Sequence, residues 1–232
     1  MAFGQGGPPM ITDDPGTPGN GHWENNIAFL FEHRPNEWSI DTPQFDLNYG
    51  WGEHIQLTLQ TEPVLLKRNG HGPVGGIGGT ETALKWRFLD EDKNGFDVSM
   101  FPRVIFNVTQ SSVRRGLAED GTRLQIPFQI AKSFGPWHAD AELGPVGITV
   151  GRSEWLYGIV GGFDVAKPTT LMAELHGTSR MNFDQEVLTV NFGIRQTLTE
   201  RFIFIGSLGH EIHTPDGDPL ALIGYIGVQL LY

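Results

Sequence analysis

Near its C-terminus the chain carries the residue types that metal binding or nucleophilic catalysis would use, a serine and two histidines. The run His210-Glu-Ile-His213 lacks the spacing of the zinc motif His-Glu-x-x-His, whose two ligands lie one helical turn apart. On a strand, residues three positions apart point to opposite faces, so neither the two histidines nor Ser207 and His210 would converge. Because a Ser-His hydrolase needs its serine beside its base, this spacing predicts no enzyme, no metal site and no cofactor.

A glycine pattern in the first half has the letters of a nucleotide-binding motif. Gly70-x-Gly72-x-x-Gly75 matches the dinucleotide fingerprint, which requires a strand before it and a helix after it. Pro73 interrupts the run, and the segment that follows has the alternation of another strand. We therefore expect a loop here.

Charged side chains recur at alternate positions, where one face of a strand would collect them. If the strands form a barrel, these side chains line its lumen, and two interpretations remain open. Pairs of opposite charge would fill the pore and stiffen its wall, or they would form a constriction that selects solutes by size and charge. The predicted lumen-lining residues are Asp46, Glu62, Lys85, Arg87, Arg103, Arg123, Glu142, Glu174, His176 and Arg195, with Asp97 and Asp140 on the same faces.

The elements that would position these charges are strands. Residues 1–21 contain six Gly and four Pro without periodicity, which predicts an irregular N-terminal arm. From residue 22 to 232 almost every segment alternates with period 2, and about twelve such segments can be counted. The run 202–208 is apolar on both faces, so its phase stays open.

The connections and the aromatic residues distinguish a membrane barrel from a soluble one. Connections alternate between short turns and longer loops, as at the periplasmic and extracellular rims of outer-membrane barrels. Aromatic side chains crowd the strand ends, which suits the two interfaces of a bilayer. A soluble barrel would instead pack the apolar faces, such as Phe29 and Leu57, inside. The predicted interface aromatics are Trp23, Trp51, Trp137, Trp155 and Tyr232.

The last strand, 219–232, ends on an aromatic residue, and we expect it to close the barrel by pairing with the strand around 27–31. Closure would place Ile223 on the lumen wall. An ordinary edge strand of a soluble β protein is the alternative. The predicted signal for barrel assembly is Tyr225, Gly227, Leu230 and Tyr232.

Composition narrows the classes of function. The 232 residues include no Cys, which excludes a disulfide framework and suits a protein that crosses an oxidising compartment. The net charge of -11 argues against nucleic-acid binding. No stretch reaches the roughly 18 apolar residues of a transmembrane helix, but barrel strands need only about 9–11 alternating residues. No apolar leader follows Met1, so we expect a mature form with a start Met.

Several short blocks resemble a family of bacterial outer-membrane proteins that is labelled MetA-pathway phenol degradation and transporter-like. The resemblance spans nearly the whole chain, implies an outer-membrane barrel, and brings no catalytic residues. Its blocks are Gly7-Pro-Pro9, Thr12-Asp-Asp-Pro15, Gly21-His-Trp-Glu24, Asp46-Leu-Asn-Tyr-Gly50, Leu84-Lys-Trp-Arg-Phe88 and Phe134-Gly-Pro-Trp137.

The sequence therefore predicts an all-β fold, a single antiparallel up-and-down transmembrane β-barrel of about twelve strands in the bacterial outer membrane. We expect a passive channel or transporter for small compounds, which the family label suggests to be hydrophobic or aromatic. The alternative is a structural or binding barrel whose lumen is plugged by charge pairs or by residues 1–21; an outer-membrane lipid-modifying enzyme is favoured least. Expected partners are outer-membrane lipid or lipopolysaccharide, the barrel-assembly machinery and a small solute.

Overall fold

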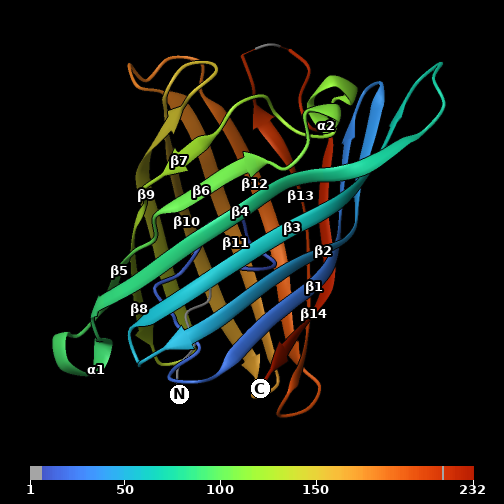
Figure 1. Ribbon diagram of the computed structural model, residues 1–232. Coiled ribbons are helices and arrows are strands. Elements are labelled where there is room, and N and C mark those ends of the chain that lie inside the picture. Colours follow the sequence, from blue (N-terminus) through green and yellow to red (C-terminus); the bar gives the residue numbers. More distant parts are fainter. Residues whose placement is uncertain (1–6, 216) are drawn as a thin grey trace.

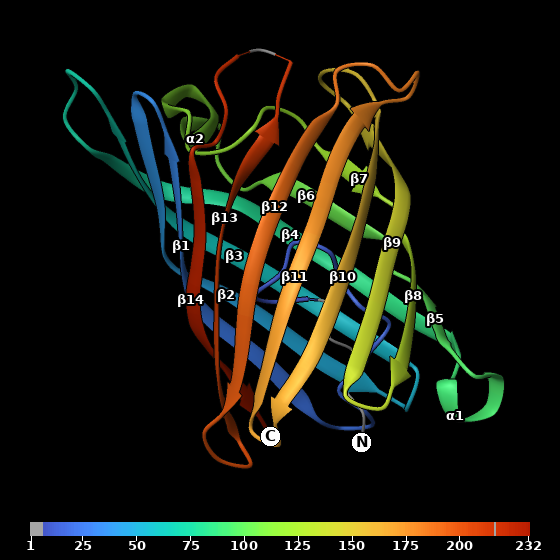
Figure 2. The ribbon, with the colours of Figure 1, turned by 180° about the vertical axis from the view of Figure 1, so that it is seen from behind.

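Long strands with alternating apolar and polar faces wrap into a closed antiparallel β-barrel, which confirms the predicted fold (Figures 1 and 2). The computed structural model describes residues 7–215 and 217–232, so residues 1–6 of the expected arm lie outside the described residues. Eight strands that run without interruption are β1 (Trp23–Arg34), β2 (Glu37–Trp51), β3 (Ile55–Arg68), β4 (Val74–Leu89), β11 (Thr169–Arg180), β12 (Val187–Thr197), β13 (Phe202–His213) and β14 (Leu222–Leu231).

Prolines divide two further strands, so that fourteen segments build twelve strands. Pro102 separates β5 (Asp97–Met100) from β6 (Arg103–Asn107), and both segments pair with β4. Pro127 separates β7 (Arg123–Gln125) from β8 (Phe128–Phe134), and both pair with β9 (Trp137–Ile148). Proline has no N–H to give to the ladder, which explains both interruptions. The remaining strand, β10 (Glu154–Ala166), continues from β9 to β11.

The barrel closes between its first and last strands, as predicted. β14 pairs antiparallel with β1 from Glu24 opposite Leu231 to His33 opposite Leu222. The two backbones approach closely: a Cβ on Gly227 would lie 2.5 Å from the Cβ of Ala28. The seam therefore requires glycine at this position of β14.

The outward face of the barrel is apolar. Five side chains that a soluble barrel would pack inside are between 39% and 63% exposed, namely Phe29, Leu57, Trp86, Phe128 and Phe192. The buried face instead carries many polar side chains, among them Asn26, Asn48 and Gln129. This inside-out arrangement is the one that membrane-spanning barrels have.

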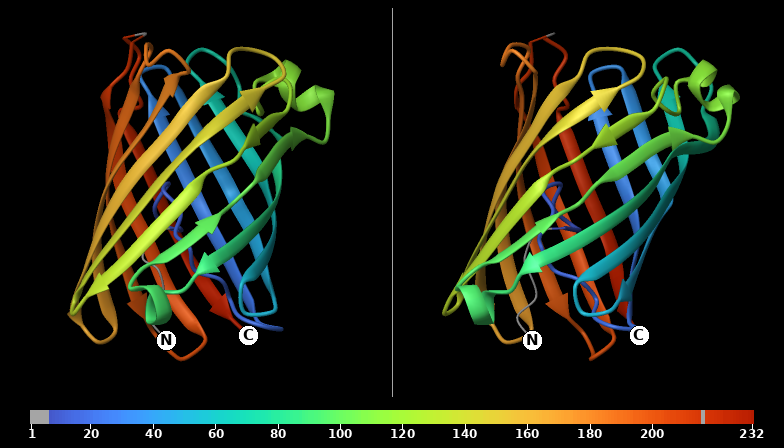
Figure 3. Two further views of the ribbon diagram at one scale, coloured as in Figure 1. Left: turned by 90° about the vertical axis from the view of Figure 1, so that its left-hand side faces the viewer. Right: turned by 60° about the vertical axis from the view of Figure 1, so that its left-hand side comes forward.

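The two rims differ in the length of their connections (Figure 3). The rim at which β1 begins and β14 ends has short turns and the helix α1 (Glu91–Asn94). The opposite rim has the longer loops and the helix α2 (Gln110–Arg115). Neither of these helices has the length and apolar composition needed to cross a membrane.

Aromatic side chains mark both rims. Trp23, Trp51, Trp137 and Tyr232 are exposed where strands begin or end at the rim of the short turns. Trp155 is half-buried at the start of β10, on the side of the long loops, and its ring stacks with that of Phe183.

The glycine-rich segment differs from its prediction, because β4 already begins at Val74 and includes Gly75. Its backbone pairs with β3. The loop after α2 occupies the space that a side chain would need, since a Cβ on Gly76 would lie 2.8 Å from Leu117. Backbone pairing needs no side chain, which is why periodicity could not detect this part of the strand.

Candidate functional site

The N-terminal arm, in its described part of residues 7–21, extends into the barrel lumen from the rim at which β1 begins (Figure 3). Lumen-facing side chains bind its backbone at several points. The N–H groups of Ile11 and Thr12 donate to the carboxylate of Glu174 on β11, and the N–H of Asp13 donates to Oε2 of Glu142 on β9 at 2.9 Å. These bonds satisfy the polar backbone that an irregular buried segment would otherwise leave unpaired.

The carbonyl groups of the arm are held by the next two strands of the same wall, β12 and β13. Arg195 on β12 donates to the carbonyl of Pro8 at 2.8 Å. The hydroxyl of Ser207 on β13 donates to the carbonyl of Pro9, also at 2.8 Å. The arm is therefore tied to strands on several sides of the lumen.

Two glycines of the wall make room for arm side chains. A Cβ on Gly158 of β10 would lie 1.9 Å from Oγ1 of Thr12, which is fully buried. A Cβ on Gly193 would lie 2.1 Å from the terminal carbon of Met10. Met10 also packs against Val160 and Met172 in a small apolar cluster. The wall and the arm fit each other closely here.

A buried lysine fixes Asp13 and Asp14 of the arm. Nζ of Lys85, which is 3% exposed, lies 2.9 Å from Oδ1 of Asp13 and donates to the carbonyl of Asp14 at 2.6 Å. Burial alone would raise the pKa of the Asp13 carboxyl. The positive charges of Lys85 and Arg103 outweigh this effect and hold the pKa below its ordinary value. Arg103 pairs with Glu142, and both cations lie over the ring of Phe101.

A row of polar side chains crosses the opposite wall from β14 to β4. Its neighbours in the register are Gln229, Asn26, Asp46, Gln60 and Glu81. Asp46 accepts a hydrogen bond from Nδ2 of Asn26 at 2.9 Å. One step toward the rim of the short turns, a second row contains Glu24, Asn48 and Thr58. The hydroxyl of Thr58 donates to Oδ1 of Asn48 at 2.6 Å.

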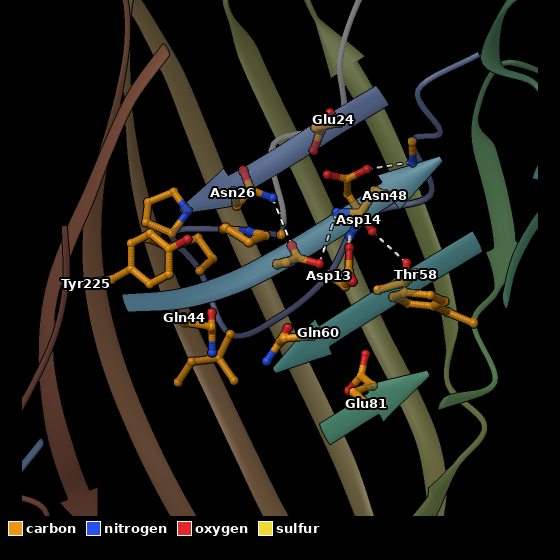
Figure 4. Close-up of a pocket in the computed structure, with 18 of the residues that line it drawn as sticks. Asp13, Asp14, Glu24, Asn26, Gln44, Asn48, Thr58, Gln60, Glu81 and Tyr225 are labelled. Atoms are coloured by element: carbon orange, nitrogen blue, oxygen red, sulfur yellow. Dashed lines mark hydrogen bonds between the residues drawn. The ribbon is translucent and has the colours of Figure 1, made fainter. Parts of the chain in front are cut away.

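Between the arm and these rows lies a cavity of about 250 Å³ (Figure 4). The figure shows Glu24, Asn26, Gln60, Glu81 and Tyr225 around it. Its lining holds five carboxylates and three basic side chains; these are Asp13, Asp14, Glu24, Asp46 and Glu81, with Lys85, Arg103 and Arg195.

The structure divides the predicted lumen-lining residues into a central and a peripheral group. The members of the central group contact the arm or line the cavity, except His176, which is included because it lies on the same face of β11 as Glu174. The peripheral residues lie nearer the rims, where each has a local partner. The central residues are Asp46, Lys85, Arg103, Glu142, Glu174, His176 and Arg195, and the peripheral ones are Glu62, Arg87 and Arg123.

The pairing of these charges differs from the predicted pattern. Arg103 and Glu142 pair across the wall, as opposite charges in a lumen should. Lys85 and Glu174 bind the arm instead. The arm has no periodicity, so no pattern in the sequence could reveal that it is the partner.

The phase of β13 and the orientation of the terminal motif are also defined. Ile203, Ile205 and Ser207 are buried, whereas His210 is exposed on the same strand. In the predicted assembly signal, Tyr225 and Gly227 face the lumen, whereas Leu230 lies on the other face of β14 and Tyr232 is exposed at the rim. Its role in assembly stays a prediction.

No family model matches the chain, and no curated protein sequence matches it. Among solved structures, it is similar to the COG4313 outer membrane channel from Pseudomonas putida F1, with a TM-score of 0.74 and 12% identity over 94% of this chain and 98% of that one. It is also similar to the NanC porin (TM-score 0.65, 9% identity, 89% of this chain and 98% of that one). The KdgM porin has a TM-score of 0.59 and 10% identity, over 88% and 98%. At these identities the likeness establishes the shared barrel fold.

Proposed function

We propose that this protein is an outer-membrane channel through which small polar solutes move passively. The observation that carries the proposal is the inside-out barrel: an apolar band faces outward, and a polar cavity of about 250 Å³ lies within. A twelve-stranded lumen is intermediate between a filled eight-stranded barrel and a wide porin, so it can pass small molecules. The structural likeness to outer-membrane channels supports the same class.

The lining favours polar solutes over the hydrophobic or aromatic compounds that the family label suggests. Phe101 and Tyr225 reach the cavity, but most of the groups around it are carboxylates, amides, hydroxyls and bases. An apolar solute would remove these groups from water without replacing their hydrogen bonds. The apolar outer band would contact outer-membrane lipid or lipopolysaccharide, after insertion by the barrel-assembly machinery.

The arm supports a second candidate, a structural or binding barrel with a plugged lumen. Its anchors reach β4, β9, β11, β12 and β13, so it narrows the path along much of the circumference. In the channel proposal the arm sets the size limit of the pore. In the plugged-barrel proposal it blocks the pore permanently.

Swelling of proteoliposomes in sugars of graded size tests the channel proposal. We expect slow swelling in the smallest sugars for the whole chain and faster swelling, with a larger size limit, after deletion of residues 1–17. If only the deleted protein swells the vesicles, although both migrate as folded heat-modifiable barrels, the arm blocks the pore and the plugged barrel is favoured. If neither folded protein swells them, the channel proposal is wrong.

A further inference from the structure

We propose that the lumen cavity binds small organic cations, in particular compounds that carry ammonium groups. This proposal deepens the channel proposal by naming its solute class, and it rests on the balance of satisfied and unsatisfied polar groups around the cavity. The three bases and the five carboxylates of the lining differ in this respect.

Each of the three bases already binds a protein group, although Nε of Arg103 has no hydrogen-bond partner among the described residues. Lys85 binds Asp13 and the carbonyl of Asp14, and Arg103 binds Glu142. Arg195 donates to the carbonyl of Pro8. An anionic solute would have to compete with these existing partners.

Two carboxylates are available instead. Glu24 and Glu81 point toward the cavity in Figure 4, and neither forms a hydrogen bond or an ion pair with any residue of 7–215 or 217–232. They lie on β1 and β4, at the two sides of the polar wall formed by β1 to β4. A cation entering the cavity therefore finds two carboxyl groups whose oxygen atoms accept no hydrogen bond from the described residues, and it would favour their ionised form.

Buried neutral acceptors point to the same conclusion. The hydroxyl of Tyr225, in a side chain 8% exposed, has no hydrogen-bond partner among the described residues. Oδ1 of Asn26, a residue 1% exposed, is also unpaired there, while its Nδ2 donates to Asp46 and so fixes the orientation of the amide. Buried polar atoms are normally hydrogen bonded, so these two suggest a ligand with several N–H donors. The Tyr225 ring can in addition receive a cation on its face.

The arrangement suits a molecule of several atoms better than a metal ion. Within the described ranges no group of three or more His, Asp or Glu is gathered closely enough to hold a metal. The unpaired acceptors are instead spread over three strands, β14, β1 and β4, and Asp46 and Gln60 lie between the two carboxyl groups. An alkyl diamine can span such separated acceptors.

Three matched four-carbon probes test the proposal: putrescine with two ammonium groups, 1,4-butanediol with two hydroxyls, and succinate with two carboxylates. Binding to the whole chain is measured in detergent micelles by equilibrium dialysis. We expect putrescine to bind at least about tenfold more tightly than either other probe. The variant E24Q/E81Q should lose at least about tenfold of this affinity. Y225F, which keeps the ring, should lose a smaller factor.

The control is E119Q/E200Q, which changes the net charge equally at exposed positions outside the cavity and should bind putrescine as the unchanged chain does. Equal or tighter binding of succinate would overturn the proposal, and so would unchanged putrescine binding in folded E24Q/E81Q. This binding measurement does not depend on transport. Absence of vesicle swelling therefore counts against the channel proposal and not against the binding of cations.

Discussion

Nζ of Lys85 lies 2.9 Å from Oδ1 of Asp13, and this buried ion pair joins the wall of the barrel to an arm that precedes it by 72 positions. The pair is surrounded by protein on both sides: the side chains are 4% and 16% exposed. Removing one partner of such a pair leaves an uncompensated charge, which typically costs about 3–5 kcal/mol. The position of the arm should therefore depend strongly on Lys85.

Lys85→Met should release Asp13 and Asp14 of the arm from β4. Since the chain has no Cys, a single Thr12→Cys substitution provides a clean reporter at a fully buried position. We expect this thiol to react slowly with a water-soluble maleimide in the otherwise unchanged protein and at least about tenfold faster with Lys85→Met. Lys93→Met, at an exposed position of α1, is the control, and equal labelling in both variants would contradict the anchoring role.

Gly158→Ala should displace the arm from the side of β10. The added methyl would lie 1.9 Å from Oγ1 of Thr12, and overpacking of this kind typically costs about 1–3 kcal/mol. We expect faster cleavage at Met10–Ile11 by a protease specific for apolar residues. Gly161→Ala, on the same strand with nothing within 4 Å of the added Cβ, should leave the cleavage rate unchanged. A similar rate for both alanines would mean that the arm does not pack on Gly158.

Ile159→Arg tests whether the outward face meets lipid. Ile159 is 58% exposed near the middle of β10, and an arginine at the bilayer midplane costs about 2–4 kcal/mol. Val165→Arg, on the same face near the end of the strand, should cost about 0–1 kcal/mol. Equilibrium unfolding from lipid vesicles measures both. Equal costs would argue against a membrane at this depth.

Gly227→Val should weaken the closure of the barrel. Its Cβ would lie 2.5 Å from that of Ala28 and 2.7 Å from the carbonyl oxygen of Ile27, across the β1–β14 seam. We expect a smaller fraction of heat-modifiable, folded protein after refolding. Gly161→Val adds the same side chain where nothing lies within 4 Å, and it should refold normally. If Gly227→Val refolds equally well, the seam is looser than described.

Period-2 alternation was sufficient to predict the barrel, because one face of each strand must be apolar and the other polar when a sheet closes around a lumen. The seam could be predicted as well, since a closed barrel leaves the last strand only the first as a partner. The alternation failed where backbone pairing carries the strand, as at Gly75, and where both faces are apolar, as along β13.

The candidate site was only partly accessible to such reasoning. Side chains that face the lumen follow from the period of the strands, so Lys85 and Glu174 could be placed on that face. Their partner in the arm could not be inferred, because an irregular segment is positioned by hydrogen bonds between distant residues. The glycines of the wall can be interpreted only once the position of the arm is known. Position 158 needs glycine because Thr12 lies against it.

Single-channel recording in planar bilayers tests the proposed function most directly. The whole chain should give small stepwise currents, and deletion of residues 1–17 should raise the conductance at least about twofold, because the arm fills part of the lumen. Absence of stepwise current from both folded proteins would contradict the channel proposal.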